Sequence, residues 1–289
     1  MYSTLAIKRR DIMEENILIA KAREIYKDIP IDPSSLETYV KLMALQETLQ
    51  RRFFGKYTEL DTEKIKEVLS QNKPAFLAVD LGLDETELGE TLKSISSLLK
   101  SELPDASKSL EIIEKAWEDK QLSMVEIGES LLHGNTGVLH AKADELGVDH
   151  EILEAVSAWV LQVLFQALSK ELSQQVDFSS WSIGKCPVCG GYTRLEYLDE
   201  KGNAHLKCQF CGTEWGYPAG KCPYCGNDDK EKITVVGMDK EKRFTLNICN
   251  NCGMYWKVVD EQVVGQEIPR RLYDLWTFRL DIVASGAKG

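Results

Sequence analysis

Apolar residues recur with a helical period over roughly the first 175 residues of the chain. Residues three and four positions apart share one face of an α-helix, so this spacing predicts amphipathic helices. We predict helices over residues 5–26, 34–54 and 61–69, and further helices that begin near residues 84, 104, 124 and 149. Their apolar stripes are interpreted as the core of a helical bundle.

Turn and capping residues mark the ends of several of these helices. Residues 28–33 contain two prolines, and proline disfavours helix in the residue before it, so we expect a break there. Ser34 and Glu37 have the spacing of a capping box, which predicts that the second helix opens at Ser34. Residues 134–137 are expected to form a turn. The longest helix, from near Asp149, has an apolar stripe broad enough to predict a central, buried position.

The pattern changes after residue 176, where the helical period ends. Residues 177–184 resemble an interdomain link in composition. Alternating apolar runs beyond this link predict β-strands over 193–198, 233–236, 243–248 and 255–259. A stripe from Arg270 to about Ala284 predicts a terminal helix that packs back on the protein. We therefore expect a helical domain over 1–180, a strand-rich region over 181–268, and a C-terminal helix and tail over 269–289.

The strand-rich region holds all eight cysteines, in four Cys-x-x-Cys-Gly motifs: Cys186, Cys189, Cys208, Cys211, Cys222, Cys225, Cys249 and Cys252. A two-residue spacer lets both sulfurs of a tight turn face one ion, and the glycine tolerates the backbone angles of that turn. Four motifs with no cysteine left over predict two tetrahedral metal sites. Disulfides are the alternative. However, the N-terminus lacks the apolar run of a secretory signal, and cytosolic thiols stay reduced.

The spacing of the motifs favours the pairing of neighbours. Eighteen residues separate Cys189 from Cys208 and 23 separate Cys225 from Cys249, and each gap contains strand-like sequence that can form a hairpin. We therefore expect one ion on the first four cysteines and a second ion on the last four. An interleaved pairing stays open, because four motifs permit three pairings.

Zinc and iron both suit a site made of four thiolates. Four filled positions leave none open to a substrate, which is typical of structural zinc and argues against hydrolysis. Iron competes because the Cys-Pro-x-Cys-Gly turns at 186–190 and 222–226 are of the rubredoxin type, and tetrahedral sulfur geometry does not distinguish the two metals. His205 lies near Cys208, but eight thiolates complete both sites, so we interpret it as a solvent-facing strand residue.

No catalytic motif accompanies the cysteines. The chain has no Gly-rich phosphate loop, no His-Glu-x-x-His and no Gly-x-Ser-x-Gly, and His133, His140 and His150 are interpreted as surface or cap residues. We therefore predict no catalytic residue, no organic cofactor and no enzyme activity. Five aromatic residues beside the motifs are interpreted as shields of the sulfurs, with a partner-binding patch as the alternative. They are Trp215, Tyr217, Tyr224, Tyr255 and Trp256.

Charge and hydropathy argue against two further classes of protein. The 289 residues carry a net charge of −11, with −12 over residues 1–180 and +1 over residues 181–289. Neither part has the Lys/Arg stripe of a nucleic-acid interface, so no nucleic-acid partner is expected. The most apolar run, Ala155 to Leu168, is too short to span a bilayer and is interrupted by polar residues, so no membrane insertion is expected.

The cysteine motifs occur within longer stretches: Cys186-Pro-Val-Cys-Gly190, His205-Leu-Lys-Cys208-Gln-Phe-Cys211-Gly-Thr-Glu-Trp215, Lys221-Cys222-Pro-Tyr-Cys225 and Ile248-Cys249-Asn-Asn-Cys252-Gly-Met-Tyr255. This series resembles the formate dehydrogenase accessory proteins of the FdhE family, as does the tail from Asp274 to Asp281. The resemblance covers about the last hundred residues by motif and the first half by length and helicity. Ala219 stands where the family typically has an arginine, so a role proposed for that arginine does not transfer.

The resemblance implies a cytoplasmic accessory protein with rubredoxin-like iron or zinc sites. Members of the family are thought to bind the catalytic subunit of a formate dehydrogenase, a molybdenum or tungsten enzyme, while it matures. We therefore expect an α+β protein with an all-α helical bundle, a small β-rich tandem rubredoxin-like or zinc-ribbon metal domain and a C-terminal helix. A rubredoxin-like iron electron-transfer protein is the alternative, and a nucleic-acid-binding zinc ribbon is a weaker third. The oligomeric state stays open.

Overall fold

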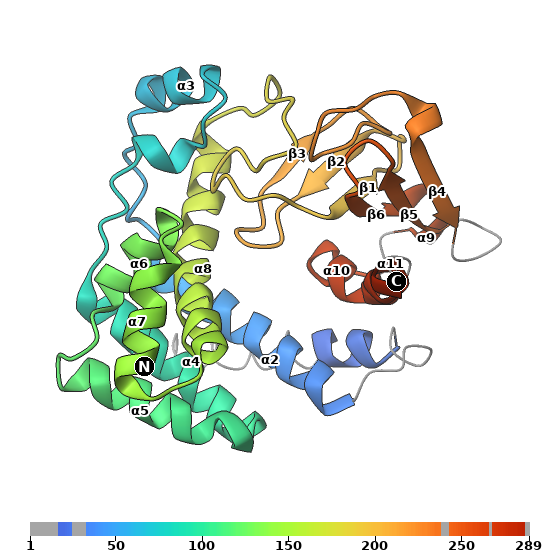
Figure 1. The fold of residues 1–289 in the computed structure, drawn as a ribbon. Helices are drawn as coiled ribbons and strands as arrows, with labels where there is room; N and C mark the ends of the chain where they lie inside the picture. The colour runs from blue at the N-terminus through green and yellow to red at the C-terminus, as the bar shows by residue number, and fades with distance from the viewer. Residues whose placement is uncertain (1–16, 25–32, 238–242, 266–267, 287–289) are drawn as a thin grey trace, which may run out of the picture. The chain divides into compact units, whose positions relative to one another are not determined.

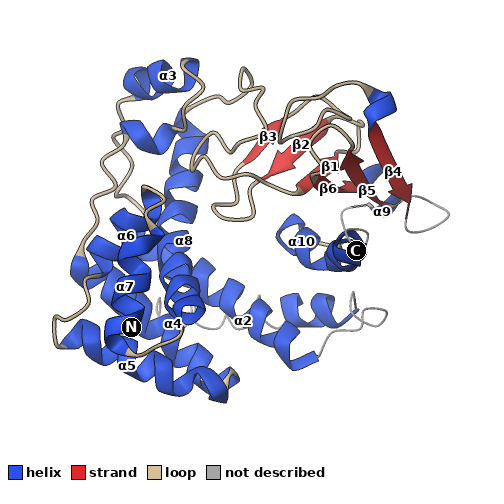
Figure 2. Cartoon of the chain, in the orientation of Figure 1, coloured by secondary structure: helices blue, strands red, loops and turns tan. Residues whose placement is uncertain are grey.

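The computed structural model describes residues 17–24, 33–237, 243–265 and 268–286. The chain divides into two compact units. The first unit comprises Met1–Ala20, Ile31–Phe53 and Leu81–Phe165, and the second comprises Lys21–Pro30, Phe54–Asp80 and Gln166–Gly289. All the described strands belong to the second unit (Figure 2). The predicted α+β fold class is confirmed, whereas the domain boundaries expected at residues 180 and 268 stay predictions.

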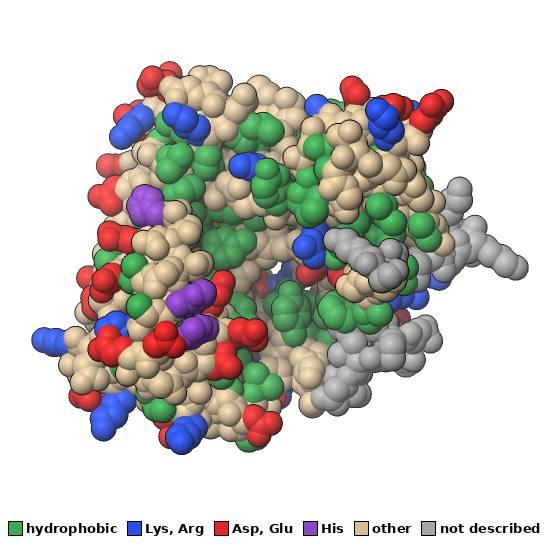
Figure 3. Space-filling view, in the orientation of Figure 1, with side chains coloured by type: hydrophobic (Ala, Val, Ile, Leu, Met, Phe, Trp, Pro, Cys, Tyr) green, Lys and Arg blue, Asp and Glu red, His purple; other side chains and the backbone are tan. Residues whose placement is uncertain are grey.

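Helices build the described part of the first unit (Figure 1). They are α2 (Pro33–Leu49), the 3-10 turn η1 (Gln50–Phe53), α4 (Glu85–Glu102), η3 (Pro104–Ala106), α5 (Ser107–Glu118), α6 (Met124–Leu132), α7 (Thr136–Leu146) and the start of α8 (His150–Gln175). On the face in view, acidic and basic side chains are interspersed over α5 and α7 (Figure 3). This mixture is the solvated side of amphipathic helices.

Capping side chains begin these helices much as the sequence predicts. Asp84 accepts a hydrogen bond from the Glu87 N–H at the start of α4, and Ser123 accepts one from the Glu126 N–H at the start of α6. The start of the second helix predicted at Ser34 is one residue late, because α2 begins at Pro33. Proline suits a first helical turn, since its fixed φ is helical and it lacks the N–H that would stay unpaired there.

Two further helix predictions have different outcomes. Residues 17–24 are helical, as expected within 5–26, but the rest of that segment and residues 28–32 of the predicted break lie outside the described residues. The turn predicted over 134–137 is correct only at its start, because α7 begins at Thr136. Gly134, with φ +68°, supplies the turn.

Close packing inside the first unit depends on particular side chains. A Cβ placed on Gly89 of α4 would lie 1.9 Å from the Trp117 ring of α5, so only glycine lets that indole pack against the helix. Buried Gln46 of α2 donates from Nε2 to Gln162 Oε1 of α8 at 2.8 Å. A buried amide must find such a partner, and this one joins two helices that are far apart in sequence.

Helix α8 is the long, apolar helix that the sequence places at the centre. Its residues include Leu153, Val160, Leu164 and Leu168, all fully buried. Contrary to the expectation that its apolar run is too short, the helix has the length and hydropathy to cross a membrane, but 61% of its most apolar stretch is buried inside the protein. A buried core helix meets the same criterion, which agrees with the predicted burial of this helix.

The second unit is built around one six-stranded sheet in the order β3-β2-β1-β6-β5-β4. The strands are β1 (Leu195–Leu198), β2 (Ala204–Lys207), β3 (Glu214–Gly216), β4 (Ile233–Gly237), β5 (Phe244–Cys249) and β6 (Tyr255–Asp260). Strands β1 and β2 form one hairpin and β4 and β5 another, as expected for the two long gaps. The parallel pairing of β1 with β6 joins these two halves into one sheet.

The remaining elements surround this sheet within the same unit: α3 (Thr62–Ser70), η2 (Ala75–Ala78), the end of α8, η4 (Lys230–Lys232), α9 (Glu261–Val264), η5 (Arg270–Leu272), α10 (Tyr273–Trp276) and α11 (Phe278–Gly286). The predicted link at 177–184 is packed, with Phe178 and Trp181 buried. The single terminal helix predicted from Arg270 is interrupted, because α10 ends at Trp276 and α11 starts at Phe278. Between them, Thr277 Oγ1 donates to the Tyr273 carbonyl.

A buried lysine attaches these C-terminal helices to the sheet. Lys257 of β6 is 1% exposed, and its Nζ donates to Asp281 Oδ2 of α11 at 2.7 Å and to the Asp274 carboxylate of α10. Asp281 also accepts from the Tyr255 hydroxyl at 2.9 Å. An ammonium group this deeply buried needs such paired carboxylates.

Candidate metal centres

The four Cys-x-x-Cys-Gly motifs fold into the same turn. In each motif the glycine N–H donates to the first cysteine carbonyl at 2.8–3.0 Å, and the first cysteine N–H donates to a carbonyl five residues later at 2.8 Å. Gly190, Gly212, Gly226 and Gly253 have φ values between +72° and +79°. The left-handed backbone that this turn requires explains the glycine in all four motifs.

The turns bring the eight cysteines together as two groups of four, and in each group the sulfurs lie within 4.8 Å of one another. Cluster 1 contains Cys186, Cys189, Cys208 and Cys211, and cluster 2 contains Cys222, Cys225, Cys249 and Cys252. The structure therefore has the sequential pairing and not the interleaved one.

The sulfur separations suit a tetrahedral metal site. In cluster 1, Cys186 Sγ lies 3.5 Å from Cys211 Sγ, and in cluster 2, Cys222 Sγ lies 3.7 Å from Cys252 Sγ. A tetrahedral ion with metal–sulfur bonds of about 2.3 Å holds its sulfurs about 3.8 Å apart. A disulfide would need about 2.0 Å, and the eight cysteines are free. Each donor set can thus hold one metal ion.

Cluster 1 lies mostly inside the second unit. Cys186, Cys208 and Cys211 are buried. The Thr213 hydroxyl lies 2.9 Å from Cys211 Sγ and 2.7 Å from the Ser169 hydroxyl of α8. These contacts connect the sulfurs to the end of the long helix.

A segment from the N-terminal half also covers cluster 1. The Ala75 N–H donates to the Pro187 carbonyl at 2.7 Å, and the Phe76 N–H donates to the Val188 carbonyl at 3.1 Å. A Cβ on Gly190 would lie 3.0 Å from the Pro74 ring. The first cysteine turn is therefore closed by residues more than 100 positions earlier in the chain.

Cluster 2 lies at the surface of the same unit. Cys225 and Cys252 are exposed, although Cys222 and Cys249 are buried against Trp256. Asn251 Nδ2 donates to Cys225 Sγ at 3.6 Å. The Tyr217 hydroxyl donates to the Cys222 carbonyl at 3.0 Å. Two of the four cysteines of this cluster thus lie at the surface.

Burial also affects the protonation of the buried thiols. Desolvation raises the pKa of Cys186 and Cys211 well above its usual range, and it raises the pKa of Cys222 to about 12. A buried thiol keeps its proton unless a cation stabilises the thiolate. These clusters therefore have the chemistry of sites in which metal binding and proton release accompany each other.

The aromatic residues near the motifs are mostly internal. Trp215, Tyr217, Tyr255 and Trp256 are at most 6% exposed, and Tyr224 is partly buried against cluster 2. Trp256 packs against Cys222 and Cys249, as a shield would, whereas the Tyr255 hydroxyl contacts Arg194 and Asp281. Burial leaves little of these four rings for a partner.

The histidines do not join the cysteine clusters. His205 lies on β2, stacks on Tyr197 with ring centroids 5.0 Å apart, and places Nε2 3.2 Å from Asp199 Oδ2. His133 is the C-cap residue of α6, as expected of a cap. His140 and His150 stack with ring centroids 4.8 Å apart, a contact that their spacing in the sequence does not predict.

Comparisons with known proteins agree with this arrangement. No family model matches the chain. A protein FdhE homolog of Aquifex aeolicus (strain VF5) is 24% identical over 233 residues, which cover 78% of this chain and 74% of that protein. The crystal structure of the FdhE protein from Pseudomonas aeruginosa has the same fold, with a TM-score of 0.63 and 19% identity over 93% of this chain and 92% of that one. The chain is therefore similar to FdhE proteins in sequence and in fold.

Matches to other FdhE proteins are shorter. Protein FdhE of Escherichia coli O127:H6 is 28% identical over 81 residues, which is 27% of this chain and 26% of that protein. The family-like tail has a clear structural role, because Asp274 and Asp281 are the two partners of buried Lys257. Ala219, where the family typically has an arginine, lies exposed in the turn before Cys222. No arginine interaction at that position is available to this chain.

Several residues of these centres were not identifiable from the sequence. Thr213, Ser169 and the segment from Pro74 to Phe76 cover cluster 1, and Glu196 of β1 lies buried beside cluster 2, where it accepts from Trp256 Nε1 at 2.7 Å. The only sequence signal among them was Thr213, which directly follows a cysteine motif. The others depend on contacts between distant parts of the chain.

Proposed function

We propose that this protein is a non-enzymatic accessory factor that binds the catalytic subunit of a formate dehydrogenase in the cytoplasm while that subunit matures. In this proposal clusters 1 and 2 each hold one structural metal ion, iron or zinc, on four cysteine sulfurs. The metals keep the second unit folded, and the surface of the protein binds the partner.

One observation carries the proposal: two complete four-sulfur clusters lie in a chain that aligns along most of its length with an FdhE homolog. All eight cysteines are used as potential ligands, so none is left as a nucleophile. A filled tetrahedral shell also has no open position for substrate. This donor set supports a structural role for the metals.

The small sheet supports the same role. Its strands are three to six residues long, and short strands bury little apolar surface by themselves. Cross-links by metal ions compensate for a small core, and their binding free energy becomes folding free energy. Loss of either metal should therefore change the shape of the second unit.

The proposal is tested by affinity capture from a cytoplasmic extract of the host, with metal analysis of the eluate. We expect the formate dehydrogenase catalytic subunit to be captured together with about two metal ions per chain, one for each four-sulfur shell. A Cys222→Ser, Cys225→Ser double variant should lose one metal and most of the captured subunit. The exposed Lys201→Ser variant is the matched control and should behave as the parent. Capture that is unaffected by metal loss would contradict the role of the clusters.

Electron transfer is the second candidate, and the exposure of Cys225 and Cys252 favours it. A redox centre must approach its partner closely, and cluster 2 reaches the surface. This candidate requires iron, because zinc has no redox chemistry. Colourless protein with zinc in both clusters, isolated without exchange of metal, would exclude it.

A further inference from the structure

Strand β3 is an edge of the six-stranded sheet, and within the described residues its outer backbone groups have no hydrogen-bond partner. The Cys208 N–H donates to the Thr213 carbonyl and the Tyr217 N–H donates to the Ala204 carbonyl. In an antiparallel ladder alternate residues bond to the neighbouring strand. Residues 213, 215 and 217 therefore face β2, whereas Glu214 and Gly216 direct their N–H and C=O groups away from it.

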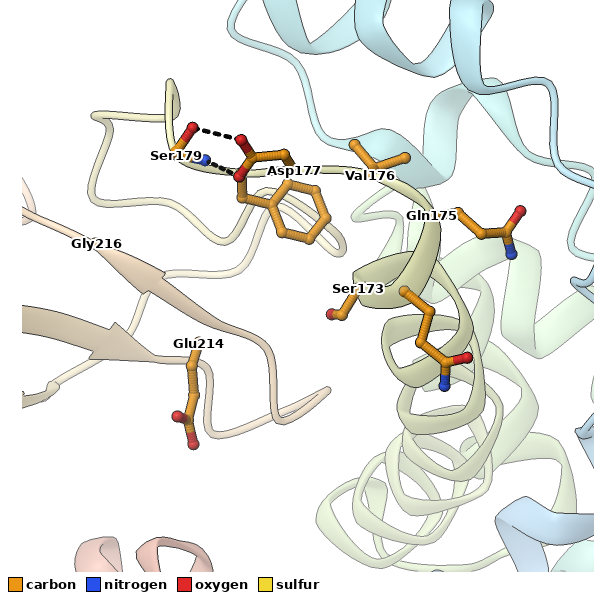
Figure 4. Close-up of a pocket in the computed structure, with 9 residues that line it drawn as sticks. Ser173, Gln175, Val176, Asp177, Ser179, Glu214 and Gly216 are labelled. Carbon is orange, nitrogen blue, oxygen red and sulfur yellow. Dashed lines mark hydrogen bonds between the residues drawn. The ribbon is translucent and has the colours of Figure 1, made fainter.

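Those two residues line a groove, here called the β3-edge groove. It has a volume of about 600 Å³ and is bounded by the last turn of α8, by residues 176–179 and by Glu214 and Gly216. Figure 4 shows Ser173 of α8 and Glu214 on opposite sides of the open space, with Asp177 and Ser179 on the loop that follows the helix. The volume is within the usual range for a ligand site.

The shape of the groove suits a main chain. Gly216 has no side chain, and a Cβ built on it would meet nothing within 4 Å, so another backbone can approach β3 closely. The three residues of β3 extend about 10 Å, enough to pair with three or four residues of an extended segment. Buried Val176 and Phe178 give the groove an apolar side.

The charge of the groove selects among such segments. Its lining contains two carboxylates, Asp177 and Glu214, and no lysine or arginine. Glu214 is already paired with Lys207 and Arg270, whereas in the described part of the chain Asp177 accepts only from Ser179. Asp177 is exposed and has no cationic partner among those residues. A lysine or arginine in the bound segment would provide one.

We propose that the β3-edge groove binds an extended segment of the partner protein as an added strand, with a lysine or arginine side chain next to Asp177. Strand addition is a common mode of peptide recognition, in which main-chain hydrogen bonds provide affinity and side-chain contacts provide specificity. The identity of the partner rests on the proposed function, but the chemistry of the groove does not depend on it.

The test compares Gly216→Pro with Gly216→Ala in the full chain. Proline removes the outward N–H without removing a bond to β2, and it is tolerated on edge strands. Alanine keeps that N–H. Two probes are used: the formate dehydrogenase catalytic subunit, and a library of nine-residue peptides with a central lysine or arginine. We expect Gly216→Pro to weaken binding of both about tenfold or more, because one bond is lost and a carbonyl is left unpaired. Gly216→Ala should weaken binding far less than Gly216→Pro, because only proline removes the N–H that bonds the added strand.

Two further measurements make the outcome decisive. Asp177→Asn keeps an acceptor for Ser179 and should weaken binding of basic peptides about two- to fivefold, as for an exposed ion pair. Amide exchange at Gly216 should slow when a peptide binds. If the subunit binds all variants equally well, the groove is not its binding site, and the proposed function is unaffected. If the peptides bind but the subunit does not, the groove is supported and the proposed function is contradicted. If neither probe binds, both proposals are contradicted.

Discussion

Clusters 1 and 2 have the same four-sulfur geometry but different surroundings. Three cysteines of cluster 1 are buried, whereas Cys225 and Cys252 of cluster 2 are exposed. Residues of η2 and the end of α8 cover cluster 1, but cluster 2 packs mainly on neighbours within the cysteine-containing region. The same sequence motif therefore produces a core site in one place and a surface site in another.

This difference indicates what each cluster contributes. A metal in cluster 1 would connect the cysteine turns to segments from the N-terminal half, so its loss should affect the whole second unit. A metal in cluster 2 would mainly link the cysteine turn that precedes β4 to the cysteine turn at the end of β5. Four experiments can test this asymmetry.

Replacement of one cysteine ligand should give the largest difference in stability between the two clusters. We expect Cys186→Ser to destabilise the second unit by on the order of 5 kcal/mol or to unfold it, because a buried metal site is lost. Cys225→Ser should have a smaller effect, since water can replace an exposed ligand. Urea unfolding with metal analysis measures both variants. Equal losses of stability would contradict the asymmetry.

A buried carboxyl group beside cluster 2 should make stability depend on pH. Glu196 is 2% exposed, and desolvation raises its pKa from 4.5 to about 7, while the Trp256 hydrogen bond opposes this rise. Between these values the folded protein keeps a proton that the unfolded chain releases, so stability falls as pH rises. We expect Glu196→Gln to be more stable than the parent by about 1 kcal/mol at pH 5 and about 3 kcal/mol at pH 8.

Urea unfolding of the parent and the Glu196→Gln variant at several pH values measures this difference. Protonation of metal-bound thiolates destabilises both proteins equally at low pH, so it cancels in the comparison. A difference that does not grow between pH 5 and pH 8 would show that Glu196 remains ionised in the folded protein.

Gly184, just before the first cysteine turn, lies close to the third cysteine turn, and this contact can be tested by adding one methyl group. A Cβ on Gly184 would lie 1.8 Å from the Pro223 carbonyl oxygen in the third cysteine turn. Backbone cannot move aside easily, so Gly184→Ala should cost about 2 kcal/mol. Gly216→Ala, whose Cβ meets nothing within 4 Å, is the matched control. Thermal unfolding compares them, and an unchanged midpoint for Gly184→Ala would refute this contact.

The rate at which the cysteines react with an alkylating reagent should show the smallest difference between the two clusters. With metal bound, we expect iodoacetamide to modify Cys225 and Cys252 about tenfold faster than Cys186 and Cys211, because a thiol reacts according to its exposure and thiolate character. Mass spectrometry of the digested protein measures the rates. Faster modification of Cys186 or Cys211 would mean that cluster 1 opens in solution.

The local parts of this protein could be predicted from its residues alone. The four cysteine turns follow from a two-residue spacer and a glycine, because their hydrogen bonds span only four or five residues. Helix α8 and the two hairpins follow from periodicity, since each requires only neighbouring residues. A missed helix such as α7 contains Gly137 and lacks a strong stripe, so its local signal is weak.

The way in which those parts are covered and joined depends on contacts between distant segments. The parallel pairing of β1 with β6, the bonds of Ala75 and Phe76 to the first cysteine turn, and the partners of Lys257 connect residues that no periodic pattern relates. These contacts are stable only when distant segments fold together, because the entropy of closing long loops must be offset by many contacts at once. The two clusters therefore share a sequence motif but differ in the residues that pack around them.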